Sequence, residues 1–443
     1  MKIPEKAPNW YDNIQDLLNR DNFNKLNEFV VEVEQRDEYV YWDKIKYLRM
    51  PEGITPKIVW SYVKFSRQSK IKKIPLISKD NQQFGYWMPN VFLKHISYVD
   101  KHASGEILVG DTTIHKSEQK KHLVNSLMEE AIASSLLEGA ATTRKKAKEM
   151  LRSGRKPKSN AEQMIFNNYK TILMIKNLIK ENLDNNLVLK LHRSMTIDTL
   201  DNPDECGRFR IVEDGPIYVK DNEGQVLHEP PSPDMIPKMM NLLYDYANKI
   251  DEKEFTHPII KAINLHFFLS YIHPFMDGNG RTARALFYWY MLKHGYWMFE
   301  YLTISRIFLS APSRYARAFL YTEIDDLDLT YFLSFHLDVI SEAIKKLIEH
   351  IKNKQKEAGE VAQYLRKFPN FNERQKALLA DALENRDRLY TVAYHGSVHN
   401  VTYEAARRDL MALYKKGFFV KGKRGRAFTF VSSERLIKKM KKI

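Results

Sequence analysis

The 443-residue sequence has little cysteine and no long apolar run. Cys206 is its single cysteine, which excludes an internal disulfide framework and a cysteine-rich zinc site. No stretch approaches 18 uninterrupted apolar residues, and the polar opening at residues 1–6 lacks the apolar core of a signal peptide. We therefore expect a cytoplasmic protein without a membrane partner. The length predicts two or three domains.

Two common phosphate-binding patterns are absent from the segment that is richest in chemical groups, residues 271–284. Neither Gly-x4-Gly-Lys-Ser/Thr nor Gly-x-Gly-x2-Gly occurs there, which excludes a plain Walker loop and a dinucleotide-binding loop. Instead, Asp-Gly-Asn-Gly separates two apolar segments, 259–272 and 281–294, which we expect to be helices. The sequence thus predicts a helix–loop–helix corner at 273–284.

The loop of this corner suits a polyphosphate. Gly278, Asn279 and Gly280 can turn backbone N–H groups toward an anion at a helix N-terminus, where the helix dipole also attracts phosphate. Arg281 and Arg284 stand three residues apart on one face of the first helical turn, and each guanidinium can bind two phosphate oxygens. The pattern predicts a phosphate-binding site.

Two further side chains supply chemistry at the same corner. Asp277 precedes the helical turn and can hold a Mg²⁺ ion that bridges the phosphates. His273 is the group here whose ordinary pKa lets it accept a proton near neutrality. A zinc site made with His257 and His266 is disfavoured, because His266 and His273 are seven residues apart and a third ligand of suitable spacing is missing.

The twelve residues from His273 to Arg284, HPFMDGNGRTAR, resemble the Fic-domain signature HPFx(D/E)GNGRxxR at every defining position. The resemblance implies an enzyme that transfers AMP from ATP to a hydroxyl group of a protein and releases pyrophosphate. It also implies that His273 is the general base, that Asp277 binds Mg²⁺, and that Arg281 and Arg284 bind the β- and γ-phosphates.

A second short motif precedes the corner. Residues 116–137 are rich in helix-forming residues and are followed by Gly139, a typical helix stop. Ser134 to Gly139, SSLLEG, resembles the family's inhibitory motif (S/T)xxxE(G/N). The resemblance implies that Glu138 pairs with Arg284 in place of the terminal phosphate, with Ser134 as a supporting partner. The alternative is an amphipathic helix with a routine glycine stop.

Two β-prone runs, 207–212 and 217–219, surround Asp214 and Gly215 and predict a hairpin. Fic enzymes have such a flap, which implies that Ile217, Tyr218 and Val219 form an exposed edge that holds the target segment by backbone pairing. An ordinary surface hairpin is the alternative. Earlier in the chain, Ser159 and Glu162 have the form of a capping box at the start of a helix.

The last part of the chain has the element order of a winged helix: a helix at 372–383, a turn at His395 and Gly396, a helix at 403–416, and two β-prone arms around a basic loop. Net charge is +15, and residues 421–443 hold nine Lys or Arg against Glu434. DNA binding through residues 371–443 is one interpretation. A module for protein contact or homodimerisation is the other.

The sequence as a whole predicts a mainly α-helical protein with a Fic helical core, a β-hairpin flap and a winged-helix domain. The expected parts are an N-terminal segment (1–100), a Fic domain (101–345) containing an inhibitory helix (116–139), a linker helix (346–370) and the winged helix (371–443). We expect Mg²⁺- and ATP-dependent AMP transfer to Ser, Thr or Tyr of a target protein or of the chain itself, restrained by Glu138, with AMP removal as a reverse reaction. The alternatives are a DNA-binding regulator with a nucleotide sensor and transfer of another nucleotide.

Overall fold

The structure is a computed structural model that describes residues 2–13, 20–36, 38–104, 108–109, 112–113, 116–221, 223–249, 255–366, 371–385, 388–399, 401–424, 427–434 and 436. The chain divides into two compact units, residues 1–347 and 348–443. Both are mainly helical, which confirms the predicted fold class. Among the described residues, no helix combines the length and the apolar character needed to cross a bilayer.

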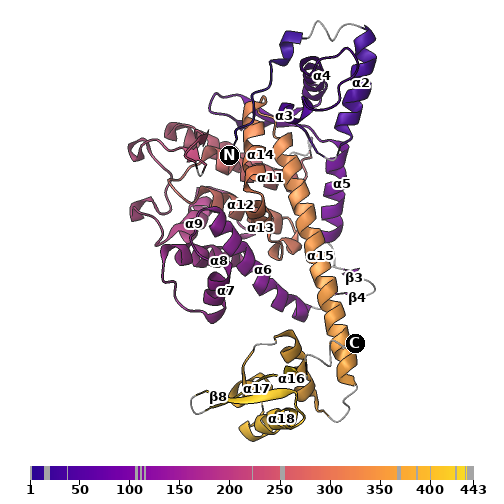
Figure 1. Cartoon of the computed structure of the whole chain (residues 1–443). Coiled ribbons are helices and arrows are strands. Elements are labelled where there is room, and N and C mark those ends of the chain that lie inside the picture. Colours follow the sequence, from indigo (N-terminus) through magenta and orange to yellow (C-terminus); the bar gives the residue numbers. More distant parts are fainter. Residues whose placement is uncertain are drawn as a thin grey trace. The chain divides into compact units, whose positions relative to one another are not determined.

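The N-terminal part of the first unit combines helices with a small hairpin (Figure 1). Its helical segments are η1 (Trp10–Asn13), α2 (Arg20–Glu34), α3 (Trp42–Ile45), α4 (Pro56–Gln68), α5 (Asn90–Val99) and the π-helical turn η2 (Asp100–Ser104). Its strands are the antiparallel pair β1 (Lys72–Ile77) and β2 (Gln83–Tyr86). Helix α4 begins where the Thr55 side chain accepts the N–H of Ile58 and Pro56 takes the first helical position.

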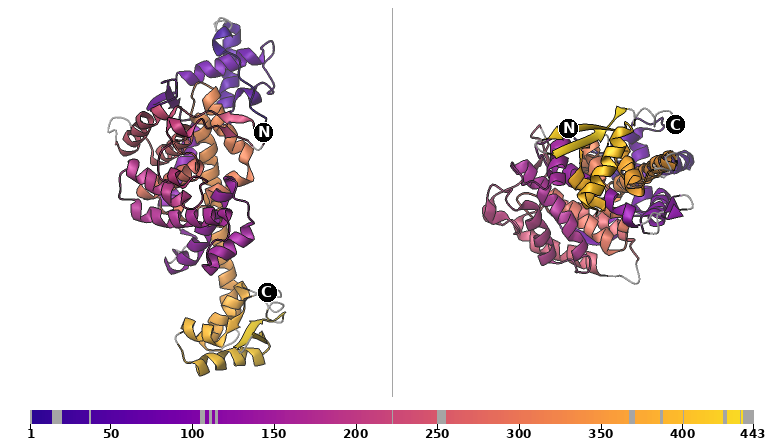
Figure 2. Two further views of the ribbon diagram at one scale, coloured as in Figure 1. Left: turned by 90° about the vertical axis from the view of Figure 1, so that its left-hand side faces the viewer. Right: turned by 90° about the horizontal axis from the view of Figure 1, so that it is seen from below.

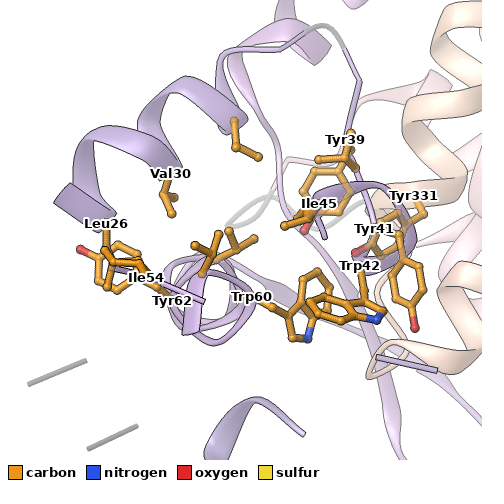
Figure 3. Packing of buried hydrophobic residues seen from close by; sticks show 14 residues of the cluster. Leu26, Val30, Tyr39, Tyr41, Trp42, Ile45, Ile54, Trp60, Tyr62 and Tyr331 are labelled. Carbon is orange, nitrogen blue, oxygen red and sulfur yellow. The ribbon is translucent and has the colours of Figure 1, made fainter. Parts of the chain in front are cut away.

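Aromatic side chains form the core of this part (Figure 3). Trp42 and Trp60 pack with ring centroids 6.2 Å apart, and Tyr41 lies against Trp60 at 5.6 Å. Leu26 of α2 is fully buried in the same cluster, which also includes Tyr331 from far along the chain. The N-terminal part therefore shares its core with the rest of the first unit.

A buried ion pair fastens α4 to the turn at residues 325–328. Lys64 Nζ lies 2.7 Å from Asp325 Oδ1 and 3.0 Å from Asp326 Oδ2, and the Lys64 side chain is 1% exposed. One turn later, the Arg67 guanidinium covers the ring of Tyr39 and donates a hydrogen bond to the Val40 carbonyl. Burial of a charged lysine is tolerated here because both carboxylates surround it.

The rest of the first unit is a helical core in which α11 and α12 lie among α8, α9 and α13 (Figure 1). Its helices are α6 (Lys116–Leu137), α7 (Arg144–Ser153), α8 (Asn160–Leu178), α9 (Asn185–Thr196), α10 (Ile236–Asn248), α11 (Pro258–Ile272), α12 (Asn279–Lys293), α13 (Ile304–Ser310), α14 (Pro312–Ile324) and the first part of α15 (Thr330–Arg366), which continues past residue 347 into the second unit. Short 3₁₀ turns occur at Pro203–Glu205, Val212–Asp214, Pro233–Met235 and Trp297–Glu300. Two small antiparallel hairpins pair β3 (Leu108–Val109) with β4 (Thr112–Thr113) and β5 (Val219–Lys220) with β6 (Val226–His228).

The predicted capping box at the start of α8 is half right. Ser159 Oγ accepts the N–H of Glu162, as expected. The Glu162 carboxylate does not return to the Ser159 backbone; it binds the Arg155 guanidinium and the N–H of Lys158. A bidentate guanidinium pair is stronger than a neutral hydrogen bond to the backbone, which explains the difference.

The second unit has its own core and a three-stranded sheet in the order β7-β9-β8, whose strands β8 and β9 run side by side (yellow in Figure 2). Its elements are α16 (Glu373–Glu384), β7 (Tyr390–Thr391), α17 (Val392–His399), α18 (Tyr403–Lys415), β8 (Phe419–Arg424) and β9 (Ala427–Ser432). The turn expected at His395 and Gly396 is wrong, because both lie within α17 and the buried His395 ring reaches Asp409. The winged-helix assignment and the domain boundaries stay predictions.

The buried ion pair of Lys64 predicts a large stability effect. The substitution Lys64→Met leaves Asp325 buried beside a neutral neighbour, and we expect it to lower the free energy of unfolding by about 3 kcal/mol. Denaturant titration followed by tryptophan fluorescence measures this unit specifically, because all six tryptophans lie within residues 1–347.

The control is Lys249→Met, which removes a surface ion pair with Asp245 whose side chains are 73% and 60% exposed. We expect it to cost less than about 0.5 kcal/mol, because water screens such pairs. Equal losses in the two variants would contradict the structural role of Lys64.

Candidate functional site

The site is built on the bend between α11 and α12. Helix α11 ends at Ile272, and His273 adopts the left-handed conformation with φ 49° and ψ 56°. A side chain with a Cβ atom is disfavoured there by about 1 kcal/mol or more, so surrounding contacts must hold the residue in place. The bend turns the chain sharply from the buried helix toward the loop 274–278.

Arg210 supplies one of these contacts. Its Nε donates to the His273 carbonyl at 2.9 Å, its Nη2 donates to the Pro231 and Ile272 carbonyls, and its backbone N–H donates to Pro274 at 2.8 Å. The carbonyls at the end of α11 have no partners within the helix, and a guanidinium can satisfy several at once. Sequence reasoning missed Arg210, which it treated as part of a β-prone run.

His192 of α9 supplies the second contact. Its ring stacks on Phe275 with centroids 3.7 Å apart, its Nε2 lies 2.9 Å from the Asp277 carbonyl, and its Nδ1 accepts the N–H of Gly207 at 3.1 Å. Because the carbonyl can only accept and the N–H can only donate, the ring is neutral with its proton on Nε2. Burial lowers the pKa of His192 to about 4, which agrees with that form.

The loop itself is closed by small residues and by Asn279. Gly278 has φ 81°, and a Cβ atom there would lie 2.6 Å from the Thr196 methyl group. The Asn279 side chain accepts the N–H of Phe275 and donates to its carbonyl, so it braces the loop. A Cβ atom on Gly280 would lie 2.3 Å from Glu138 Oε1, so any other residue there would displace that carboxylate.

Glu138 therefore lies directly on the first turn of α12. Its Oε1 is 2.9 Å from Arg284 Nη1, and the Arg284 side chain is 4% exposed. The other guanidinium nitrogens are occupied by Ser134, because Nε donates to Ser134 Oγ at 3.0 Å and Nη2 donates to the Ser134 carbonyl at 2.9 Å. The contact that the sequence resemblance implied between Glu138 and Arg284 is present, and Ser134 joins it.

Burial opposes the charge of Arg284, and nearby groups restore it. Desolvation lowers the pKa of Arg284. Glu138, Tyr315 and Glu130 raise it by more, so the pKa of Arg284 lies above its ordinary value. Burial raises the pKa of Glu130, although hydrogen bonds from the Ser305 backbone and side chain oppose this shift. Arg284 thus stays a cation in a buried position, ready to bind one anionic group.

Arg281 is placed differently from Arg284. Its fully buried guanidinium donates to the Met195 carbonyl at 3.2 Å and to Asp277 Oδ2 at 2.9 Å. Arg281 lies beneath the loop in this structure and fixes the orientation of Asp277, while Arg284 is the arginine that reaches Glu138. The Asp277 side chain is 55% exposed, so part of its carboxylate faces outward. The phosphate-binding role of Arg281 stays a prediction.

The His273 ring is held in its neutral form. Its Nδ1 lies 3.2 Å from the Ser270 carbonyl, which can only accept, so Nδ1 carries the proton and Nε2 carries the lone pair. Burial lowers the pKa of His273 to about 4, and the bond to Ser270 opposes the shift. The ring is therefore neutral at pH 7 and can accept a proton at Nε2.

The predicted hairpin is displaced along the chain. Residues 212–214 form a 3₁₀ turn because Arg208 binds both Asp214 oxygens and the Ile211 N–H donates to the same carboxylate. The strands are β5 and β6, joined by a turn in which the Asp221 carboxylate accepts the N–H groups of Glu223 and Gln225. Of the flap residues Ile217, Tyr218 and Val219, Val219 alone lies in a strand, and the Tyr218 side chain is exposed. The expectation of arms at 207–212 and 217–219 is wrong.

The two remaining histidines have structural contacts. His257 Nδ1 accepts the N–H of Ile259 and caps α11, and the buried His266 ring lies 2.9 Å from the Tyr315 hydroxyl. Within the described part of the chain, no group of three His, Cys, Asp or Glu side chains could hold a metal ion. The contacts of the two rings agree with the packing interpretation of His257 and His266.

Comparison with known proteins agrees with this site. Residues 182–291 match the model of the Fic/DOC family, so the chain contains a Fic domain. Over 109 residues it is 37% identical to Protein adenylyltransferase Fic of Nematostella vectensis, and over 110 residues it is 34% identical to Protein adenylyltransferase fic-1 of Caenorhabditis elegans. These stretches cover 25% of this chain and only 23% and 19% of the two relatives.

Two solved structures share the fold. A Fic family protein from Desulfovibrio desulfuricans G20 matches with a TM-score of 0.51 and 18% identity over 78% of this chain and 97% of that chain. Fic-1 from C. elegans matches with a TM-score of 0.51 and 18% identity over 75% of this chain and 86% of that chain. At this identity the similarity shows the fold, and it confirms the expected Fic helical core.

The neutral state of His192 predicts a pH effect on stability. Its pKa is about 4 in the folded protein and about 6.5 in an unfolded chain, so the unfolded state binds more protons between these values. Its contribution is complete above pH 6.5 and is lost as the pH falls toward 4. Between pH 7.5 and pH 5 we expect the wild type to lose about 2 kcal/mol more unfolding free energy than His192→Gln.

Denaturant titrations by tryptophan fluorescence at the two pH values measure this difference. The other buried histidines contribute equally in both proteins and cancel. Parallel pH profiles of the wild type and His192→Gln would show that His192 is not held neutral by the loop.

Proposed function

We propose that the chain is a protein adenylyltransferase that transfers AMP from ATP to a Ser, Thr or Tyr hydroxyl of a target protein or of itself. The observation that carries the proposal is the Glu138 carboxylate, which lies against Gly280 at the start of α12 and beside the buried Arg284. A carboxylate held there marks a place that binds anionic oxygen. The names of the relatives that match the Fic domain support the same activity.

The geometry of the site allows AMP transfer in a single displacement at the α-phosphorus. The target hydroxyl oxygen attacks the α-phosphorus of ATP, and a new O–P bond forms as the bond to pyrophosphate breaks. His273 Nε2, which carries the lone pair, takes the hydroxyl proton. Backbone N–H groups at the start of α12 and the Arg284 guanidinium would bind the charge of the β- and γ-phosphates. Pyrophosphate leaves, and AMP stays on the target.

The residues fit a Mg²⁺ ion that arrives with the nucleotide. Mg²⁺ commonly takes one or two protein carboxylates and fills its remaining positions with phosphate oxygens and water. Asp277 offers a partly exposed carboxylate oriented by Arg281, and no group of three His, Cys, Asp or Glu side chains in the described part of the chain could hold a metal ion by itself. Asp277 would hold the ion, whose chemical contribution is to offset negative charge on the phosphates.

Glu138 would hold this activity in check. Its carboxylate occupies the Arg284 contact that the terminal phosphate needs, and Ser134 secures the same guanidinium. The substitution of Glu138 would free both the arginine and the space above Gly280. In a separate hydrolysis, Glu138 would orient a water molecule that attacks the phosphorus of the modified hydroxyl. The bond to the target oxygen breaks, AMP leaves, and the target oxygen regains a proton.

The inhibitory role predicts opposite effects of two substitutions. We expect Glu138→Gly to raise self-AMPylation by about tenfold or more, since a charge-assisted contact worth about 1.5–3 kcal/mol no longer competes with ATP. We expect His273→Ala in the Glu138→Gly background to lower it by about a hundredfold or more. Incorporation of label from ATP labelled at the α-phosphate measures both.

The matched control is Glu149→Gln, which neutralises an exposed carboxylate on α7 and should leave labelling at the wild-type level. Glu138→Gln keeps the size of the side chain and should give a smaller increase than Glu138→Gly. Equal labelling by Glu138→Gly with and without His273 would exclude the assignment. Parallel reactions with GTP, CTP and UTP identify the preferred base.

A second candidate function concerns the C-terminal unit. Arg407, Arg408 and Lys415 are exposed on α18, and Lys423 is exposed on β8, so one helix and the adjoining strand carry several cations. We propose that this unit binds DNA, with α18 as the contacting helix. A protein-contact or homodimerisation module remains the competing interpretation. The side chains of Arg424 and Arg426, which belong to the basic stretch between the two predicted β-prone arms, lie outside the described residues.

The DNA proposal predicts a salt-dependent gel shift of the full chain. Removing one cation that binds a phosphate reduces the slope of log affinity against log salt by about 0.9. Arg407→Gln/Arg408→Gln should therefore weaken binding and flatten this slope by about two. A chain that shifts no duplex DNA at low salt, or variants with the wild-type slope, would favour the protein-contact interpretation, which sedimentation of the same proteins then tests.

A further inference from the structure

Helix α6 is held against α13 by a buried carboxylate. Glu130 lies about two turns before the end of α6 and is 3% exposed, and Ser305, the second residue of α13, is fully buried. Glu130 Oε2 accepts the backbone N–H of Ser305 at 3.1 Å, and Oε1 contacts the Ser305 hydroxyl group. The two helices, both labelled in Figure 1, pack against each other. Glu130 therefore anchors α6 at a place separate from the Glu138–Arg284 contact.

The start of α13 requires an acceptor of this kind. The first N–H groups of a helix have no partner within it, and the side chain just before the helix commonly accepts one of them. Thr303 stands at that position, but within the described part of the chain its side chain accepts none of these N–H groups. Glu130 caps α13 instead. Both protonation states of the carboxylate keep the two contacts, because a protonated Oε1 can donate to the Ser305 hydroxyl while Oε2 accepts the N–H.

The anchor shares one face of α6 with the inhibitory motif. Residues four apart lie above one another on a helix, so Ser134 follows Glu130 on the same face, one turn later. Ser134 binds the Arg284 guanidinium through its hydroxyl and its carbonyl. Glu138 lies four residues further along, just past the end of α6, and contacts the same guanidinium. The face that docks on α13 is thus the face that presents Ser134 and Glu138 to Arg284.

We propose that Glu130 is a positioning residue of the inhibitory helix, whose contact with the start of α13 sets the place of Ser134 and Glu138 against Arg284. Release of α6 from α13 would then open the Arg284 contact to a terminal phosphate even while Glu138 is present. The consequence of that opening for activity rests on the proposed function. The anchor itself is a property of the chain and requires no nucleotide.

The residue before Glu130 provides a matched comparison. Glu129 is also a carboxylate of α6, but it binds α7, where Arg144 donates to both of its oxygens and Lys148 donates to one. The Arg144 and Lys148 side chains are 52% and 25% exposed, so water can replace Glu129 there. Loss of Glu130 instead leaves the Ser305 N–H buried without its acceptor, which is more costly. The two neighbouring carboxylates therefore separate the anchor on α13 from a general effect on α6.

Nucleotide affinities of the full-length protein test the anchor. The probes are the α,β-methylene analogues of ATP and ADP with Mg²⁺, and titration calorimetry gives the ratio of their two affinities. Because the analogues differ by one phosphate and cannot transfer AMP, this ratio reports on the terminal phosphate and is insensitive to a loss of folded protein. We expect Glu130→Ala to raise the ratio about tenfold above the wild type, as we expect for Glu138→Gly, because α6 is no longer docked firmly.

Three further variants make the test specific. Glu130→Gln should keep the wild-type ratio, because its amide oxygen accepts the Ser305 N–H and its amide nitrogen donates to the Ser305 hydroxyl. Glu129→Ala should keep it as well. Ser305→Ala removes the hydroxyl contact alone and should give a smaller rise than Glu130→Ala, and it carries the test if Glu130→Ala does not fold.

A wild-type ratio in Glu130→Ala and Ser305→Ala beside a raised ratio in Glu138→Gly would overturn the proposal and leave the proposed function standing. An equal rise in Glu129→Ala would overturn it too. A wild-type ratio in Glu138→Gly would instead contradict the proposed inhibition, and hydrogen exchange of the amides of residues 131–135 then tests the anchor. We expect their protection to be about tenfold lower in Glu130→Ala than in Glu129→Ala, and equal protection would contradict the anchor.

Discussion

The contact between Glu138 and Arg284 is the interaction on which this account depends. It joins the end of the helix α6 to the second turn of α12, and it places a carboxylate on the backbone of Gly280 in the first turn. An arginine that is almost fully buried requires a negative partner, and Glu138 provides one from within the chain. The same requirement is what would let a terminal phosphate replace Glu138, since both groups offer anionic oxygen to one guanidinium.

The position of the Glu138–Arg284 contact is fixed because side chains from other elements hold the bend between α11 and α12. His273 is in a strained backbone conformation, and Arg210 and His192 hold the residues on either side of it through carbonyl oxygens. Asn279 braces the loop from within. These contacts fix His273, Asp277 and the N-terminus of α12 relative to one another, as the proposed transfer of AMP requires.

The sequence predicted those features of the site that are local. Twelve consecutive residues carry the corner, and the periodic apolar segments on both sides predicted α11 and α12 to within two residues. The roles of Arg210 and His192 could not be predicted because the carbonyl groups of His273 and Asp277 that they contact lie 63 and 85 residues away, and these contacts depend on how the helices pack. The hairpin was misplaced because the Arg208–Asp214 ion pair overrides β propensity, and Arg281 faces inward because Met195 and Asp277 offer it acceptors.

The most direct test is a crystal structure of Glu138→Gly soaked with Mg²⁺ and a non-hydrolysable ATP analogue. The account predicts that the terminal phosphate takes the position of the missing carboxylate, against Gly280 and within hydrogen-bond distance of Arg284. A triphosphate bound away from the start of α12, with Arg284 still paired to groups of the protein, would contradict it.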